Sequence, residues 1–187
     1  MTNDTQTNQA ASTALPSIRE ASVMMRGALG QIRFARDYTL QLLEATPKDR
    51  WFEIPDGHCT HIAWQVGHLT VSQYGLLMFR VRGRQPEDLQ LIPGKFRKAY
   101  GRQSSPVADA ACQPSADELL QRMTTVYDRA LGELESIDPA ALNDPIDMPY
   151  AAYPTKLGAI LFCPMHETIH AGQIGLLRRG LGLEPVR

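Results

Sequence analysis

The chain has 187 residues, a length that suits a single domain with an adequate hydrophobic core. Hydrophobic residues make up 43% and charged residues 21% of the chain, and the formal net charge is −1. This balance is ordinary for a globular protein and gives no support for nucleic acid or an acidic membrane as a partner. No apolar run reaches the ~18–20 residues that span a bilayer, so we expect no membrane segment.

The first fifteen residues are polar and lack the basic start and apolar centre of a signal peptide. We therefore predict a flexible tail over residues 1–15, one domain over residues 16–187 and a cytoplasmic location. An odd, low cysteine count in such a chain predicts reduced thiols rather than disulfides. The three cysteines are Cys59, Cys112 and Cys163.

The first two predicted helices lie in the N-terminal half of the domain. Apolar residues recur every three or four positions over residues 17–45, and Ser17 with Glu20 forms a capping box at the start. A second helix is predicted over residues 60–82, with Thr60 as its N-cap.

The last two predicted helices lie in the C-terminal half. One spans residues 115–137 and again begins with an S-x-x-E capping box. The other spans residues 155–179 and contains Pro164, which removes one helical hydrogen bond. We expect Pro164 to kink this helix or restart it. In a restarted helix, His166 would lie in the first turn, where the helix dipole disfavours a charged imidazole.

Two long connections separate these helices, over residues 84–114 and 138–154. No segment shows the sustained alternation of a strand, so the pattern predicts an all-α fold. Long connections are compatible with a four-helix bundle that is not simply up-down-up-down, and long loops often cover a site. Arg97, Tyr150 and Tyr153 lie in these connections and reach a substrate only if the loops fold over it.

The segment HETIHAGQ, residues 166–173, holds two histidines four positions apart. On a helix, His166 and His170 share one face with Cβ atoms ~5–6 Å apart, so both rings can reach one metal ion. His68, in the segment WQVGHL, is the third candidate ligand, and Gly67 beside it allows close approach of a neighbouring helix. Three neutral imidazoles leave a coordination position open for water or substrate, as catalytic metal sites do.

Other residues near the histidines have both a functional and a structural interpretation. Gln173 shares the face of His166 and His170 and either orients a ligand or bridges helices. Glu167 lies on a different face from His166, so we expect it to support the ligands from behind or to lie on the surface rather than to bind the metal. His61 is too far along its helix to share the metal but can line the same pocket, and Trp64 packs beside His68. Cys163 precedes His166 by three residues, and Pro164 disturbs that geometry. The histidine pair itself has a structural alternative, a satisfied pair with no metal.

The segments IAWQVGHL (62–69) and HETIHAGQIGLLRRGLGL (166–183) together resemble the motifs of the DinB superfamily of metal-binding four-helix bundles. The resemblance covers most of the chain from residue 17 onward. It implies that His68, His166 and His170 are the metal ligands, and that the metal is zinc or nickel. It also implies an up-down-down-up bundle and a homodimer.

Three functions are compatible with these residues, and the resemblance favours the first. The first is a metalloenzyme in which the metal activates the thiol of a low-molecular-weight cofactor, or a water, for transfer or hydrolysis. The second is a non-catalytic metal-binding stress-response bundle. The third is a helical domain with no metal. We expect a small molecule rather than nucleic acid as the partner, because no basic patch or nucleic-acid motif is present.

Overall fold

A computed structural model describes residues 14–148 and 151–186. Most of the predicted tail over residues 1–15 lies outside the described residues, as does Tyr150. The described residues form helices and no strand, apart from one isolated bridge between Pro145 and Thr155. The predicted all-α class is therefore confirmed. Within the described residues, no helix has the length and apolar character needed to cross a membrane.

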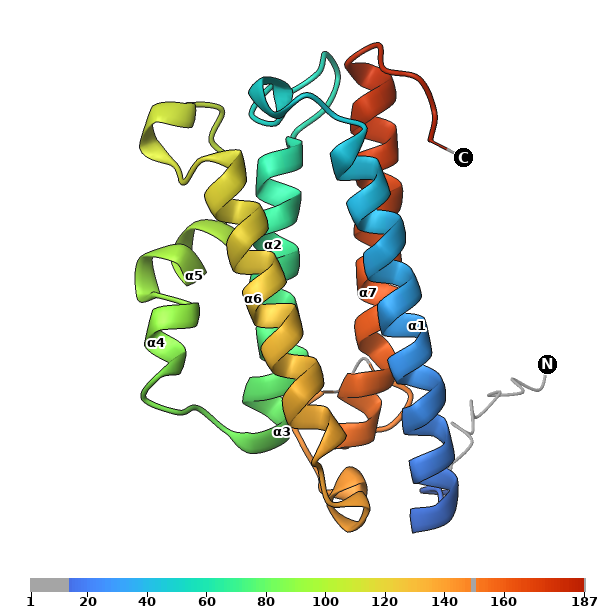
Figure 1. The fold of residues 1–187 in the computed structure, drawn as a ribbon. Helices are drawn as coiled ribbons and strands as arrows, with labels where there is room; N and C mark the ends of the chain where they lie inside the picture. Colours follow the sequence, from blue (N-terminus) through green and yellow to red (C-terminus); the bar gives the residue numbers. More distant parts are fainter. Residues whose placement is uncertain (1–13, 149–150, 187) are drawn as a thin grey trace, which may run out of the picture.

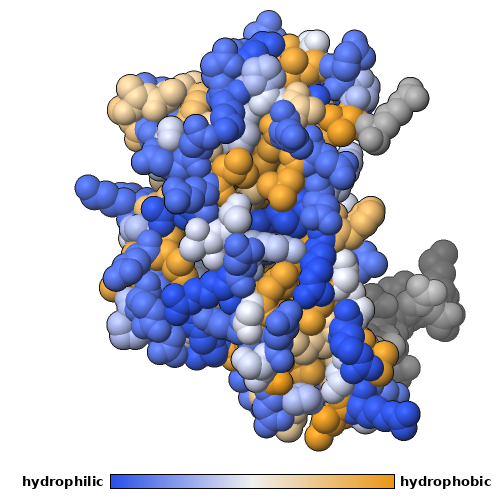
Figure 2. Space-filling model, viewed as in Figure 1, coloured by the Kyte–Doolittle hydropathy of each residue, from blue (hydrophilic) through white to orange (hydrophobic). Residues whose placement is uncertain are grey.

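The bundle consists of four long helices. They are α1 (Ile18–Glu44), α2 (Ile62–Gln73), α6 (Ala116–Glu135) and α7 (Lys156–Gly180). Helix α1 packs mainly against α7, and α2 packs against both α6 and α7. In the view of Figure 1, α1 and α7 run from bottom to top, whereas α2 and α6 run from top to bottom. Hydrophobic side chains gather in the seam between α6 and α1, flanked by hydrophilic ones (Figure 2).

Both predicted capping boxes are present. The Glu20 carboxylate accepts a hydrogen bond from the Ser17 backbone N–H at 2.8 Å, and the Ser17 hydroxyl accepts one from the Glu20 N–H at 3.3 Å. Ser115 and Glu118 repeat this arrangement at the start of α6. Each box satisfies N–H groups that the first helical turn leaves without partners, so the two starts were readable from sequence.

The predicted N-cap of α2 is wrong by one residue. His61, not Thr60, caps the helix, because its Nδ1 accepts a hydrogen bond from the Trp64 N–H at 3.1 Å. The Thr60 hydroxyl instead accepts a hydrogen bond from the Gln65 side chain at 3.1 Å. A histidine cap is hard to predict, because the usual cap residues are Ser, Thr, Asp and Asn.

The predicted helix over residues 60–82 is present but changes character near its end. After α2, residues Tyr74–Phe79 form a π-helical turn, η2, and a short α3 (Arg80–Arg82) completes the segment. Gly83 then ends it with a φ of +80°, which suits glycine. π-Helical turns are rare and occur mostly near functional sites, and this one begins six residues after His68.

Helix α7 runs without a break from Lys156 to Gly180, with Pro164 inside it. The alternative of a helix that restarts at Pro164 is therefore wrong, and His166 lies in the middle of α7 rather than in a first turn. The segment stays helical because packing outweighs the single hydrogen bond that proline removes, since Cys163, Pro164 and Glu167 are all buried. Because His166 is not in a first helical turn, the helix dipole does not explain a neutral His166.

Both long connections contain helical turns. The first holds α4 (Asp88–Leu91), α5 (Gly94–Tyr100) and the short η3 (Ala110–Cys112). Helices α4 and α5 lie beside α6 (Figure 1), and α5 packs against α2. The second connection holds η4 (Pro139–Asn143), and η1 (Lys48–Arg50) follows α1. The first connection is therefore a structured layer over α2, the helix that carries His68.

Candidate metal centre

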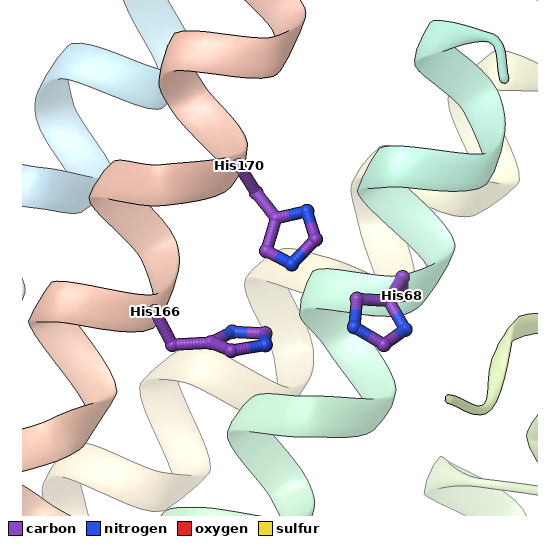
Figure 3. A group of neighbouring side chains, drawn as sticks. All are labelled: His68, His166 and His170. Carbon is purple, nitrogen blue, oxygen red and sulfur yellow. The ribbon is translucent and has the colours of Figure 1, made fainter. Parts of the chain in front are cut away.

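The structure brings His68, His166 and His170 together between α2 and α7. One ring nitrogen from each lies within 4.8 Å of those of the other two. The ring centroids are 4.5 Å apart for His166 and His170, 4.8 Å for His68 and His170, and 5.4 Å for His68 and His166. Figure 3 shows the three rings pointing from the two helices into a common space.

Two of these rings are held from behind through Nδ1. His170 Nδ1 lies 2.6 Å from Gln65 Oε1, and His68 Nδ1 lies 2.9 Å from the Tyr100 carbonyl oxygen. Both partners are acceptors only, so each Nδ1 carries the proton and donates it. In a neutral ring, Nε2 is then the nitrogen with the available lone pair. Metal-binding histidines in proteins are held in this way.

His68 is further fixed by the aromatic side chains around it. The Trp64 ring stacks on it with centroids 4.8 Å apart and planes within 6° of parallel, and Trp64 Nε1 donates to the Ser104 hydroxyl at 3.0 Å. Gly67 faces the Tyr100 ring so closely that a Cβ atom would lie 2.3 Å from Tyr100 Cδ1. The close approach expected at Gly67 is thus made by a side chain of α5, and it places the Tyr100 carbonyl over His68.

The three rings are neutral at physiological pH. Burial lowers the pKa of His166 to about 4 and that of His170 to about 3, and it also lowers the pKa of His68. Mutual repulsion between charged rings adds to the shift of His166 and His170. Neutral imidazole is the form that binds metal, so loss of water contact does what the helix dipole was expected to do.

The remaining predicted pocket residues differ in position. Trp64 lies directly against His68. Gln173 is exposed on α7, yet a hydrogen bond of its side chain opposes the lowering of the His170 pKa. His61 is fully buried and its Nε2 donates to the Val107 carbonyl at 2.9 Å, while Nδ1 caps α2. Both nitrogens of His61 are therefore engaged in holding the first connection against α2.

Glu167 and Cys163 are buried residues of α7 that do not belong to the histidine cluster. The Glu167 carboxylate is buried and accepts a hydrogen bond from Arg36 Nε at 2.6 Å. Cys163 is buried, and desolvation, with a smaller contribution from the Glu167 charge, raises its thiol pKa far above the usual range. Such a thiol is a packing group rather than a thiolate ligand or nucleophile.

A cavity of about 790 Å³ opens beside the histidines. His68 and His166 form part of its wall, and the Ser72 hydroxyl, also on the wall, lies 3.3 Å from His68 Nε2. Apolar side chains from η2 and α7, among them Phe79 and Phe162, line it further. A group bound by the histidines is therefore reachable by a small molecule.

The donor set fits a divalent transition metal. Three neutral nitrogen donors suit zinc, nickel, copper or iron, and they leave at least one coordination position for another ligand. The Nδ1–H groups of His68 and His170 are already paired, so a metal would take the nitrogens that face one another.

Three contributors to this site were missed from sequence. Gln65 and Ser72 both lie on α2, three residues before and four after His68, so helical spacing could have placed them near it. The third contributor is the backbone carbonyl of Tyr100. A carbonyl carries no sequence signal, and only the fold of the first connection brings it to His68.

Comparisons with known proteins agree with this fold. A family model described as the DinB superfamily matches residues 31–174. Among solved structures, an uncharacterised protein from Escherichia coli UTI89 is similar, with a TM-score of 0.56 and 14% sequence identity. That match covers 86% of this chain and 95% of the other, and at this identity it supports the fold alone. No curated protein matches the chain.

Proposed function

Because the chain belongs to the DinB superfamily, we propose that it binds one divalent metal ion, zinc or nickel, on His68, His166 and His170. The observation that carries this proposal is the convergence of the three rings within 4.8 Å, with the outer nitrogens of two already held by Gln65 and the Tyr100 carbonyl. Buried neutral histidines whose free nitrogens face one another are arranged as ligands are.

We further propose that the protein is a metalloenzyme acting on a small molecule. When bound, a divalent ion supplies Lewis acidity, which activates a thiol or a water for attack on an electrophile. The cavity beside His68 and His166 gives substrate access, and the apolar residues Phe79 and Phe162 on its wall exclude water from one side. Ser72 is placed to hold a proton near His68 Nε2.

The attacking atom comes from outside the protein in this proposal. The buried Cys163 thiol keeps its proton and faces the Glu167 side of α7. A low-molecular-weight thiol in the cavity is therefore our first choice, and water, giving hydrolysis, is the second. The alternative class is a non-catalytic metal-binding bundle, in which the ion closes its coordination with a fourth protein ligand and the cavity stays unused.

Metal content tests the core of the proposal. We expect untagged wild-type protein to carry about one equivalent of metal by mass spectrometry, as three imidazole donors predict. His170→Ala should lose it. His58→Ala is the matched control, because His58 lies outside the cluster and should keep the metal. Absence of metal in the wild type, with no uptake of added zinc or nickel, would make the cluster structural.

Cobalt substitution separates the enzymatic from the non-catalytic alternative. Co²⁺-loaded protein should develop a thiolate-to-cobalt charge-transfer band when cysteine is added as a probe thiol, because a coordination position is open. A closed four-coordinate site would show no such band at any cysteine concentration.

We also propose that the protein forms a homodimer through α1 and α7. Their outer faces expose large apolar side chains, of which Phe34 is 71%, Met165 61% and Ile169 56% exposed. Exposed apolar patches of this kind mark interaction surfaces. Light scattering should give twice the monomer mass for the wild type and the monomer mass for Phe34→Asp, whereas an unchanged mass in the variant would exclude this face.

A further inference from the structure

The cavity beside the histidine cluster has a strongly basic wall. Four of its lining residues are arginines, and Asp147 is the one acidic residue among them. The arginines are Arg80, Arg84, Arg97 and Arg102. The whole chain holds 19 basic and 20 acidic residues, so its composition does not predict this local excess of positive charge.

These arginines lie on successive elements of one stretch, residues 80–102. Arg80 begins α3, Arg84 follows it, Arg97 lies on α5, and Arg102 lies just beyond α5. The first connection folds back over α2 and so gathers them around one cavity. Their gathering is a product of the tertiary fold and not of a single charged helix face.

Three of these four arginines have no carboxylate partner among the described residues. Within residues 14–148 and 151–186, Arg84, Arg97 and Arg102 form no ion pair and are exposed. By contrast, five other arginines in the described residues are paired with carboxylates. These are Arg33, Arg36, Arg50, Arg82 and Arg129.

We propose that this cavity binds a small organic dianion, a dicarboxylate or a phosphate ester, through Arg84, Arg97 and Arg102. Guanidinium groups bind carboxylate and phosphate oxygens in pairs of charge-assisted hydrogen bonds, and apolar walls around them strengthen such bonds. The inference rests on the proposed function in treating the cavity as the substrate site: the anionic end lies against the arginines while the reacting end reaches the histidines.

The test is calorimetric titration of the metal-free protein, prepared on a chelating resin so that no chelator anion remains. Succinate and phenyl phosphate are the probes, and succinamide and phenol are their uncharged analogues. The wild type should bind at least one dianion and neither analogue. The preferred probe tells whether carboxylate or phosphate is recognised.

Two double variants with equal charge change separate the cavity from general electrostatics. Arg97→Gln with Arg102→Gln should weaken dianion binding by about tenfold or more, because lost charge-assisted hydrogen bonds are worth about that much. Lys95→Gln with Lys98→Gln removes the same charge from α5 outside the cavity lining and should change the affinity less than about twofold.

The outcomes keep this inference separate from the metal proposal. Arginine-dependent dianion binding in a protein that takes up no metal supports the anion site and sinks the metalloenzyme. Metal uptake without any dianion binding overturns the anion site and leaves the metal proposal standing. Equal losses of affinity in the arginine and lysine variants also overturn it, because the charge would then act only at a distance.

Discussion

Two buried polar clusters meet on neighbouring faces of α7. On one face, Glu167 binds Arg36 of α1, and Arg36 Nη2 also donates to Gln73 Oε1 at 2.9 Å. The Arg36 guanidinium also lies over the Tyr127 ring, 4.7 Å from its centroid. On the other face, His166 and His170 meet His68. In the first cluster the charges of Arg36 and Glu167 neutralise each other. In the second, three uncharged rings turn nitrogens toward one another.

The difference separates polar groups that hold the bundle from polar groups that await a ligand. The buried ion pair supplies its own counter-charge, although the Nε2 atom of Gln73 beside it is buried without a hydrogen-bond partner. Burial lowers the pKa values of the three histidines, so their rings stay neutral and their lone pairs can be shared by one metal cation.

The largest expected effect of a single substitution on stability is at the buried ion pair of Arg36 and Glu167. Glu167→Ala leaves Arg36 charged and buried without its partner, which costs about 3–5 kcal/mol of unfolding free energy. Urea denaturation measures this loss. The control is Glu135→Ala, which breaks the exposed pair with Arg33 and should cost less than about 1 kcal/mol. Equal losses of unfolding free energy in the two variants would show that the buried ion pair stabilises the bundle no more than the exposed one.

The next largest effect is the loss of unfolding free energy when metal is removed from the histidine cluster. Zinc at about a hundredfold excess over its dissociation constant should stabilise the protein by about 2.7 kcal/mol relative to the metal-free form. The shift of the urea midpoint measures it. His170→Ala should abolish this increment, whereas Glu167→Ala should keep it despite its lower stability. An increment that survives in His170→Ala would place the metal elsewhere.

Two glutamines of α2 serve the two clusters and give a finer test. Gln65→Leu removes the acceptor behind His170 and should weaken metal affinity by about 10–100-fold. Gln73→Leu removes a partner of Arg36 and should lower stability by about 1–3 kcal/mol with metal affinity unchanged. Competition with a chromophoric chelator measures affinity, and a drop in affinity for Gln73→Leu would contradict the separation.

The pH dependence of the metal-free protein tests the histidine cluster without any metal. The pKa values of His166 and His170 fall to about 4 and about 3 on folding from 6.5, so below pH 6.5 the unfolded chain binds protons that the folded protein does not. Stability should be full above pH 6.5 and fall as pH decreases toward 4, by up to about 1.4 kcal/mol per pH unit for each histidine. His166→Gln should flatten the slope measured by denaturation at several pH values, and an unchanged slope would count against this account.

Much of the fold was readable because it rests on local chemistry. Capping boxes at Ser17 and Ser115 and the apolar stripes behind them predicted α1 and α6. The π-helical turn at Tyr74–Phe79 was not predicted, and the choice between a continuing and a restarted helix at Pro164 was left open, because tertiary packing decides both.

The candidate site divides in the same way. His166 and His170 share a helix face by spacing alone. His68 was a candidate from its place on the second predicted helix, and the resemblance strengthened it. The burial of Glu167 against Arg36 and the Tyr100 carbonyl behind His68 depend on contacts between segments distant in sequence. The arginines come from one stretch, but their place beside His166 also depends on the fold. The pattern of residues within one segment does not predict such contacts.

The hydrogen-bond partner of His68 Nδ1 is a main-chain atom, so the substitutions that would disturb this bond lie at other positions. No side-chain replacement at position 100 deletes a carbonyl, so genetic change at that codon cannot remove the hydrogen bond directly. The vulnerable position is Gly67, where even alanine would push against the Tyr100 ring and displace α5. A saturation screen for metal loading should therefore flag an apparently bland glycine as sharply as the ligands themselves.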